Sequence, residues 1–461
     1  MARDVVDETR ISSRDELVSW LEEGSKPQGP FLIGTEHEKV PFYRADLRPV
    51  PYQGRPERGQ EGIRALLEGL RLSQNWEAIE DGGAIIGLYD PRGGGAISLE
   101  PGGQFELSGA PLDNVHQTDA ELRAHFAALE PLCEKLGIGF LDFGMSPLWS
   151  REETPIMPKQ RYAIMARYMP KVGRLGLDMM FRTSTVQTNI DFASEADMIA
   201  KMRLALAVQP MITALFANSP FTDGKPNGFL SMRSQIWTDT DPARTGMLPF
   251  VFAPGMGFES YVDYALDVPL YFVKRGDVYH DVAGASFRDL LEGRLADLPG
   301  VHATLSDWAN HLSTLFPEVR LKRYMEMRGA DVGPPSHIVA LAALCAGLFY
   351  DSQASEAAWD LVKDFSAEER QSFRDQAPKL GLQAKAGGRR LLDLARDILP
   401  LARAGLTRRR RLDASGADEG RYLLALEEIA ASGLNLAEQR LTLFHGGWNQ
   451  SVAPAFDYCV F

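Results

Sequence analysis

The sequence contains little cysteine. Only Cys133, Cys345 and Cys459 occur in 461 residues, far apart and without a CxxC pair. Disulfide-stapled domains and thiol redox motifs need closely or regularly spaced cysteines, so neither class is indicated. We therefore expect buried thiols and a reducing compartment.

Long apolar runs are also scarce. The first twenty residues place charges every few positions and contain no apolar core of signal-peptide length. The longest uncharged run, residues 204–222, contains two prolines, a glutamine and an asparagine, and polar groups are costly in lipid. This run predicts a buried, proline-kinked helix. We expect a soluble, cytoplasmic protein with no membrane partner.

Several catalytic motifs are missing. The sequence has no Walker lysine motif, no GxGxxG after a predicted strand, no HExxH or clustered His and Cys, and no GxSxG. Ordinary nucleotide-binding loops, zinc enzymes and serine hydrolases are therefore not indicated. The formal net charge of −13 disfavours a nucleic-acid partner, because phosphate binding needs clustered Lys and Arg.

The order of the predicted elements indicates an α+β protein. Helices are predicted over residues 160–171 and from a capping box at Ser194, and the pattern is almost wholly helical from Ser336 onward. We predict one domain over residues 1–461, with a catalytic sheet core over about residues 30–335 and a helical region over 336–461. Strands are predicted at residues 31–43, 84–88, 104–108, 138–144, 181–192, 268–274 and 319–328.

Two pairs of glutamates belong to predicted strands. Glu36 and Glu38 are two residues apart, so they point to the same side of a strand. Glu100 and Glu106 flank a glycine-rich turn that lets the chain fold back. Neighbouring carboxylates repel each other unless a cation lies between them, and Mg²⁺ prefers such oxygen ligands. An exposed strand face and a purely structural turn are the alternatives.

Three further segments carry candidate polar groups. Residues 181–192 form a polar strand that either faces water or lines a polar cavity. In residues 319–331, Glu326 suits a metal and Arg328 a phosphoryl group, although a cross-strand salt-bridge face explains the pattern equally well. Arg233, on a short strand-like segment, suits a substrate carboxylate.

Glutamates on different strands, together with arginines and without a Walker motif, predict a sheet-built, multi-metal phosphoryl-transfer site. Long motifs make this more specific: IGTEHEK, LEPGGQFELSGAPL, MPKQRYAIMARYMP, RTSTVQTNIDFASEADM, FLSMRSQIWTDTDP and RLKRYMEMRGAD. They closely resemble the glutamate–cysteine ligase family, in its plant and proteobacterial branch. The resemblance runs from about residue 30 to about residue 350, with a similar helical tail.

The resemblance implies a glutamine synthetase-like fold, with a curved, mainly antiparallel sheet, flanking helices and a concave face that holds Mg²⁺ and ATP. It assigns Arg233 to a carboxylate of glutamate and Arg328 to the transferred phosphate, both as catalytic residues. It places Arg182 and Gln187 in the same substrate pocket, Gln187 at a position where another branch has a metal-binding histidine. It implies five magnesium ligands: Glu36, Glu38, Glu100, Glu106 and Glu326.

The implied reaction is the ATP-dependent ligation of the γ-carboxylate of L-glutamate to the amine of L-cysteine, the first step of glutathione biosynthesis. MgATP would phosphorylate the carboxylate to γ-glutamyl phosphate, and the amine would then displace phosphate. The implied partners are the small molecules glutamate, cysteine and ATP. Plant members carry regulatory cysteine pairs where this chain has Asp119, Val282, Asp297 and Val339. We therefore expect a monomer or a weak homodimer.

Three alternative functions stay open at this point. An enzyme of the same fold could use another amine, because nothing in the sequence identifies a pocket for a thiol side chain. A non-catalytic homologue could bind metal or nucleotide and regulate a partner, although the complete acidic set argues against it. A multi-metal hydrolase such as a phosphatase would release phosphate without needing both amino acids.

Overall fold

The computed structural model describes residues 6–458 of the chain. Cys133 and Cys345 are buried and unpaired, as predicted. Cys459, for which a buried thiol was also predicted, lies outside the described residues.

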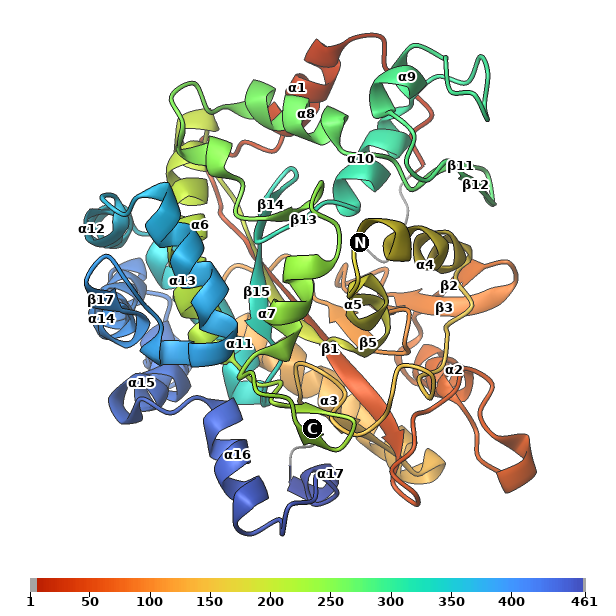
Figure 1. Ribbon diagram of the computed structural model, residues 1–461, viewed down its shortest axis with the longest axis vertical. Helices are drawn as coiled ribbons and strands as arrows, with labels where there is room; N and C mark the ends of the chain where they lie inside the picture. Colours follow the sequence, from red (N-terminus) through yellow and green to blue (C-terminus); the bar gives the residue numbers. More distant parts are fainter. Residues whose placement is uncertain (1–5, 459–461) are drawn as a thin grey trace.

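A nine-stranded sheet lies at the centre of the molecule, with strand order β14-β15-β7-β1-β5-β4-β3-β2 and β6 paired to the second half of β1 (Figure 1). All of its strand pairs are antiparallel, which confirms the predicted α+β class with a mainly antiparallel sheet. The strands are β1 (Ile33–Tyr43), β2 (Glu77–Asp81), β3 (Ala84–Tyr89), β4 (Ala96–Leu99), β5 (Phe105–Ser108), β6 (Ile138–Leu141), β7 (Thr185–Ile190), β14 (Val319–Leu321) and β15 (Met325–Asp331).

Helices cover both faces of this sheet. One face packs against α2 (Ile63–Gln74), α3 (Val115–Leu136), α6 (Glu195–Phe216) and α11 (Pro335–Phe349) and forms the apolar core. Residues of four helices close over the other face: α4 (Gln160–Val172), α5 (Gly176–Arg182), α7 (Met232–Ile236) and α10 (Leu305–Ser313). The alternation along β1 follows from this arrangement, since His37 and Lys39 are buried while Glu36 and Glu38 stay half-buried.

The remaining elements surround the sheet and its two helical layers. They include α1 (Arg14–Glu22), α8 (Phe258–Asp267), α9 (Phe287–Leu291) and three hairpins or short pairs: β8–β9 (Phe221–Thr222, Lys225–Pro226), β10–β13 (Thr245–Gly246, Phe316–Pro317) and β11–β12 (Phe272–Arg275, Val278–Asp281). The strand predicted at residues 268–274 begins at Phe272, four residues after its predicted start, and belongs to the small β11–β12 hairpin.

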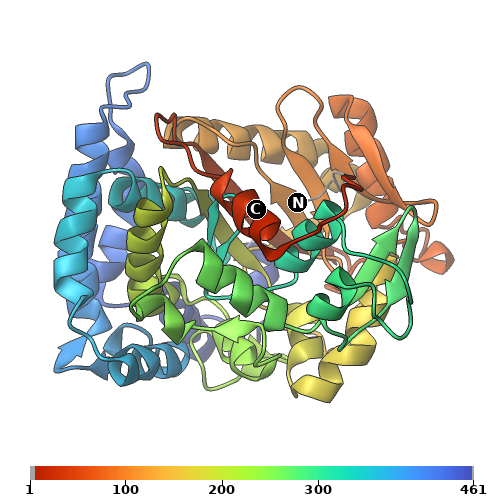
Figure 2. The same ribbon diagram turned by 90° about the horizontal axis from the view of Figure 1, so that it is seen from above.

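The C-terminal region is helical, as predicted. Helices α11, α12 (Ser352–Val362), α13 (Ala367–Leu380), α14 (Leu391–Arg409) and α15 (Leu424–Ser432) gather beside α6 on one side of the molecule, away from the β2–β3 hairpin, and Figure 2 shows the same grouping from above. Helices α16 (Leu436–His445) and α17 (Ala455–Tyr458) lie at the bottom of Figure 1. The region also contains one small β16–β17 hairpin (Lys385–Ala386, Arg389–Arg390). Because a continuous apolar core joins α1, strands β1, β7, β14 and β15, α6 and helices α11 to α15, we propose a single domain.

Helix α6 begins at its predicted cap, where the Ser194 hydroxyl accepts a hydrogen bond from the Asp197 backbone. Among residues 6–458 it is the one helix that is by itself long and apolar enough to cross a membrane, and α11 with α12 passes the same test only as a bent pair. In α6, 83% of that apolar window is buried inside the molecule. The predicted buried helix with an internal proline, Pro210, is confirmed.

Three further predicted strands differ from the structure. Residues 319–328 form two strands, because the chain turns at residues 322–324 and pairs Arg320 with Glu326 across the hairpin. The segment around Arg233 is helix α7, because the Ser231 hydroxyl caps the Ser234 backbone N–H. The polar strand at residues 181–192 is shorter, since Arg182 still belongs to α5.

Candidate active site

A polar pocket lies over the helix-capped face of the sheet. Its cavity volume is about 200 Å³, it opens to solvent, and residues of β1, β5, β7 and β15 form its floor. Most predicted site residues line it together: Glu36, Glu38, Glu100, Glu106, Gln187, Arg233 and Arg328. The tertiary structure thus gathers residues that are almost three hundred positions apart in the sequence.

Four glutamates form one side of this pocket, which we call the acidic wall: Glu36, Glu38, Glu100 and Glu106. Strand register explains their proximity, because Glu38 on β1 lies directly opposite Glu106 on β5. Glu106 accepts hydrogen bonds from Ser98 Oγ at 2.9 Å and Ser108 Oγ at 2.7 Å. Asn189 Nδ2 donates to Glu36 at 2.8 Å, and the Thr185 backbone N–H donates to Glu38 at 3.0 Å.

The glycine-rich turn between β4 and β5 sets the position of Glu100. The Glu100 backbone N–H bonds the Gln104 carbonyl at 2.9 Å, and Gly103 adopts a φ of +89°. A Cβ on Gly102 would lie 2.1 Å from the Phe181 carbonyl oxygen, so no side chain fits there. The structure therefore gives this turn a packing reason as well as a place at the pocket.

Electrostatic crowding is strong at the acidic wall. Burial raises the pKa of Glu38 well above its ordinary range, and the charges of Glu100 and Glu106 raise it further. Burial and the neighbouring Glu106 raise the pKa of Glu100 to about 7. A bound cation would relieve this repulsion, so the donor set fits the hard, oxygen-seeking Mg²⁺. Within residues 6–458 no three acidic, histidine or cysteine side chains already surround one point closely enough to hold a metal ion.

Four cations form the neighbouring side, the basic wall: Arg233, Arg320, Lys322 and Arg328. Arg233 is only 3% exposed and donates through Nη2 to the Arg328 carbonyl at 2.9 Å. Its Nη1 is buried without a hydrogen-bond partner among the described residues, and the nearest carboxylate oxygen, on Asp331, is 3.9 Å away. An unsatisfied buried guanidinium donor at a pocket suits a ligand carboxylate.

Gln187 and Arg328 act as a pair. Arg328 Nη1 donates to Gln187 Oε1 at 2.6 Å, and both side chains line the pocket. Thr183 and Thr185 line it too, so the polar strand predicted from residues 181–192 faces a polar cavity and not bulk water.

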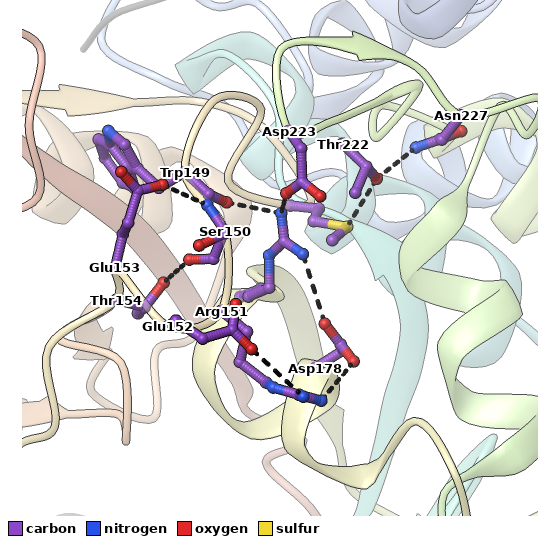
Figure 3. Close-up of polar contacts among 12 residues, drawn as sticks. Trp149, Ser150, Arg151, Glu152, Glu153, Thr154, Asp178, Thr222, Asp223 and Asn227 are labelled. Atoms are coloured by element: carbon purple, nitrogen blue, oxygen red, sulfur yellow. Dashed lines mark hydrogen bonds and ion pairs between the residues drawn. The ribbon is translucent and has the colours of Figure 1, made fainter.

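Arg182 is not among the residues that line the pocket. It is buried, and its Nη2 donates at 2.6 Å both to the Trp149 carbonyl and to Asp223, while Nη1 lies 3.4 Å from Asp178. Figure 3 shows Asp178 and Asp223 beside the loop of residues 149–154. The prediction of Arg182 as a substrate-binding residue is therefore corrected: two carboxylates already match its charge, and it ties this loop to α5 and to the β8–β9 turn.

Glu326, which was predicted to bind magnesium in the pocket, lies elsewhere in the structure. It is completely buried and is not among the pocket-lining residues. Arg320, Lys322 and Arg328 surround its carboxylate. The salt-bridge explanation left open for this segment is the one that the geometry favours, and Glu326 does not fit a magnesium ligand in this arrangement.

Sequence reasoning missed several lining residues. Arg161 and Tyr162 come from α4, and Trp237 and Phe316 pack with tilted rings whose centroids are 5.4 Å apart. Arg161 and Tyr162 lie in the motif MPKQRYAIMARYMP, which supported the family resemblance but yielded no candidate residue. The signal was present, but a helical segment does not reveal which of its faces meets a distant strand.

Comparison with known proteins is consistent with this geometry. Residues 32–456 match the model of Glutamate-cysteine ligase family 2 (GCS2). This chain belongs to the glutamate–cysteine ligase family. The resemblance noted in the sequence is thereby confirmed.

Relatives in this family match nearly the whole chain. The chloroplastic glutamate–cysteine ligase of Nicotiana tabacum is 52% identical over 445 residues, covering 96% of this chain and 82% of the relative. The Arabidopsis thaliana enzyme of the same name is 52% identical over 449 residues, covering 97% and 83%. A crystal structure of the Francisella tularensis glutamate–cysteine ligase in complex with AMP covers 92% of this chain and 86% of that chain, with a TM-score of 0.51 and 14% identity. That likeness supports the glutamine synthetase-like fold.

The predicted cytoplasmic location is wrong by this comparison. The Nicotiana tabacum, Solanum lycopersicum, Arabidopsis thaliana and Medicago truncatula relatives are all named as chloroplastic. The prediction rested on scattered cysteines and on the charged N-terminal segment. Unpaired thiols indicate a reducing compartment and argue against an oxidising one, but they do not show which reducing compartment the protein occupies.

Proposed function

We propose that this chain joins the γ-carboxylate of glutamate to the amine of cysteine, using ATP and Mg²⁺. The observation that carries the proposal is that carboxylates and cations from distant segments meet in one pocket. Family membership supports it, because the curated relatives are named glutamate–cysteine ligases. Amide formation from a free carboxylate needs activation, and phosphoryl transfer from ATP to give γ-glutamyl phosphate supplies it.

Each group of the substrates would be bound by side chains of the opposite charge. Arg233, with its unpartnered buried Nη1, would hold a carboxylate of glutamate, and Arg328 would face the transferred phosphoryl group. Gln187 would keep the Arg328 guanidinium oriented. The acidic wall would hold Mg²⁺, which supplies charge neutralisation between the phosphate oxygens and the glutamate substrate. Cysteine would then attack the activated carbonyl through its amine, so no covalent intermediate with the protein is needed.

The proposal is tested by measuring ADP release from the purified chain with glutamate and Mg²⁺. Cysteine, 2-aminobutyrate and a simple amine are compared as acceptors. Cysteine-dependent release is expected, with little release when glutamate or the acceptor is omitted. Equal rates with all amines would remove cysteine as the substrate. Rapid ADP formation without any amino acid would favour a hydrolase.

Arg233→Lys gives a sharper test, because lysine keeps the charge and loses the two-pronged donor. The KM for glutamate should rise about 10- to 100-fold, the range of charge-assisted hydrogen bonds. Arg440→Lys is the matched control, since Arg440 is 5% exposed, pairs with Asp142 at 2.6 Å and is not among the pocket-lining residues. An unchanged KM in Arg233→Lys would contradict the assigned role.

The partners are proposed to be small molecules only, and the chain is proposed to be a monomer or a weak homodimer. Light scattering over a concentration series tests the oligomeric state. A concentration-independent dimer mass would contradict it.

A further inference from the structure

Glu326 lies where three cations converge. Its carboxylate Oε1 is 2.6 Å from Lys322 Nζ, and Oε2 bonds Arg320 Nε and lies 3.5 Å from Arg328 Nη1. The side chain of Glu326 has no exposed surface, whereas Glu36, Glu38 and Glu100 of the acidic wall are half-buried. Both of its oxygens are therefore used inside the protein.

The three cations are themselves held in place. Lys322 is 3% exposed and Arg320 is 6% exposed. Arg320 Nη1 donates to the Ser313 and Leu315 carbonyls, each at 2.8 Å, while Gln187 fixes Arg328. Glu326 contacts all three cations and Glu36 of the acidic wall also attracts them, so two carboxylates balance three cations and this part of the pocket keeps a net positive charge.

A magnesium ion would not fit beside Glu326. It would have to displace Lys322 or Arg320 from the carboxylate and would then face the repulsion of the remaining cations. The position that a metal would take at Glu326 is filled by the chain's own ammonium and guanidinium groups. An anion meets the opposite situation, because Arg320, Lys322 and Arg328 all line the pocket.

We propose that Glu326 is a positioning residue and not a magnesium ligand, and that it fixes Arg320, Lys322 and Arg328 as a site for phosphoryl oxygens. The identity of the anion rests on the proposed function, whereas the absence of metal at Glu326 does not. The acidic wall alone then binds Mg²⁺, and the basic wall binds the phosphoryl group from the other side.

The direct test is a crystal structure of the full chain with Mn²⁺, which replaces Mg²⁺ and is located by anomalous scattering. Peaks are expected at the acidic wall, with Lys322 and Arg320 still bonded to Glu326. A Mn²⁺ ion at ligand distance from a Glu326 oxygen, about 2.1 Å for Mg²⁺-like coordination, would overturn the proposal. This experiment needs neither ATP nor an amino acid, so its outcome does not depend on whether the chain catalyses the ligase reaction.

Solution measurements supply the second test. Mn²⁺ binding to Glu326→Gln, followed by electron paramagnetic resonance without nucleotide, should keep the wild-type number of sites, whereas Glu38→Gln should lose a site. In assays, Glu326→Gln should raise the KM for ATP by about 10-fold, the effect of one weakened charge-assisted contact, without raising the Mg²⁺ concentration for half-maximal activity. Loss of a Mn²⁺ site in Glu326→Gln would overturn the proposal.

Removing a buried anion can prevent folding. If circular dichroism shows that Glu326→Gln is unfolded, the double variant with Lys322→Met removes one cation together with the anion and is judged by the same Mn²⁺ site count. If the Mn²⁺ results hold but the chain releases no ADP with glutamate and cysteine, only the proposed reaction fails.

Discussion

Replacing Lys39 by methionine should stabilise the protein, and the gain should depend on pH. Lys39 lies on β1, behind the acidic wall, and is completely buried. Its Nζ lies 3.3 Å from His37 Nδ1 and within 6.0 Å of the ring centroids of Phe105, Phe126 and Phe140. Within residues 6–458 no carboxylate forms an ion pair with it, so its charge is poorly compensated.

The magnitude follows from the pKa. Burial lowers the pKa of Lys39 from its ordinary 10.5 to about 7. One pKa unit corresponds to about 1.4 kcal/mol, so the charged form costs about 5 kcal/mol in the folded state. The unfolded chain keeps the ordinary pKa and binds more protons between pH 7 and pH 10.5, so stability rises with pH over that window. The full cost applies below pH 7.

Lys39→Met removes this cost. The free energy of unfolding should increase by up to about 5 kcal/mol at pH 6 and by about 2 kcal/mol at pH 9. Urea denaturation across this pH range measures it, with the slope compared between variants. Lys201→Met is the matched control, because Lys201 is also buried but pairs with Asp197 at 2.8 Å, so its loss should destabilise. A Lys39→Met gain that is absent, or that does not shrink at high pH, would refute the reasoning.

Four further predictions concern the pocket and its supports. Because the pKa of Glu100 is about 7 and that of Glu38 is also raised, protons compete with Mg²⁺, and the Mg²⁺ concentration for half-maximal activity should fall as pH rises from 6 to 8.5; a flat profile would contradict this. In the absence of divalent cations, the raised pKa of Glu100 should make the protein less stable as pH rises from about 4.5 to about 7, because only the folded state keeps the proton there, and added Mg²⁺ should restore its melting temperature; the same slope with and without Mg²⁺ would be inconsistent. Gly102→Ala should lose about 1–3 kcal/mol of stability and raise the Mg²⁺ requirement, since its Cβ would meet the Phe181 carbonyl; wild-type values for both would refute the packing argument. Arg182→Gln should cost about 1–3 kcal/mol by removing the buried guanidinium that bonds the Trp149 carbonyl and Asp223, while the KM for glutamate stays unchanged; a large rise in that KM would return Arg182 to the substrate pocket.

Local sequence patterns were sufficient for much of the fold. The alternation in residues 33–43 gave β1, the Ser194 cap gave the start of α6, and the apolar helical periodicity beyond Ser336 gave the C-terminal helices. Errors occurred where a short local contact decides the conformation. The Ser231 cap makes a helix around Arg233, and the tight turn at residues 322–324 divides one predicted strand into two.

The candidate site was predicted unevenly for the same reason. Glu36 and Glu38 share a face by strand geometry alone. Local patterns also suggested Glu100, Glu106, Arg233, Glu326 and Arg328, and the family motifs gave each candidate its role. Nothing in the local pattern separates Arg233, which keeps an unpartnered donor at the pocket, from Arg182, whose charge is matched by Asp178 and Asp223. Both are buried arginines, and their difference lies in residues distant in sequence.

The sequence by itself determined the family, the α+β class and the residue types available for chemistry. Its motifs are long, and strand and helix periodicities are set by neighbours within a few residues. Only the tertiary structure decided which charges face a substrate and which neutralise each other. Burial and pairing depend on the register of β1, β5, β7 and β15. Glu38 is buried beside other carboxylates, with Glu106 directly opposite it, and becomes difficult to ionise. Glu326 meets Arg320 and Lys322 and stays charged.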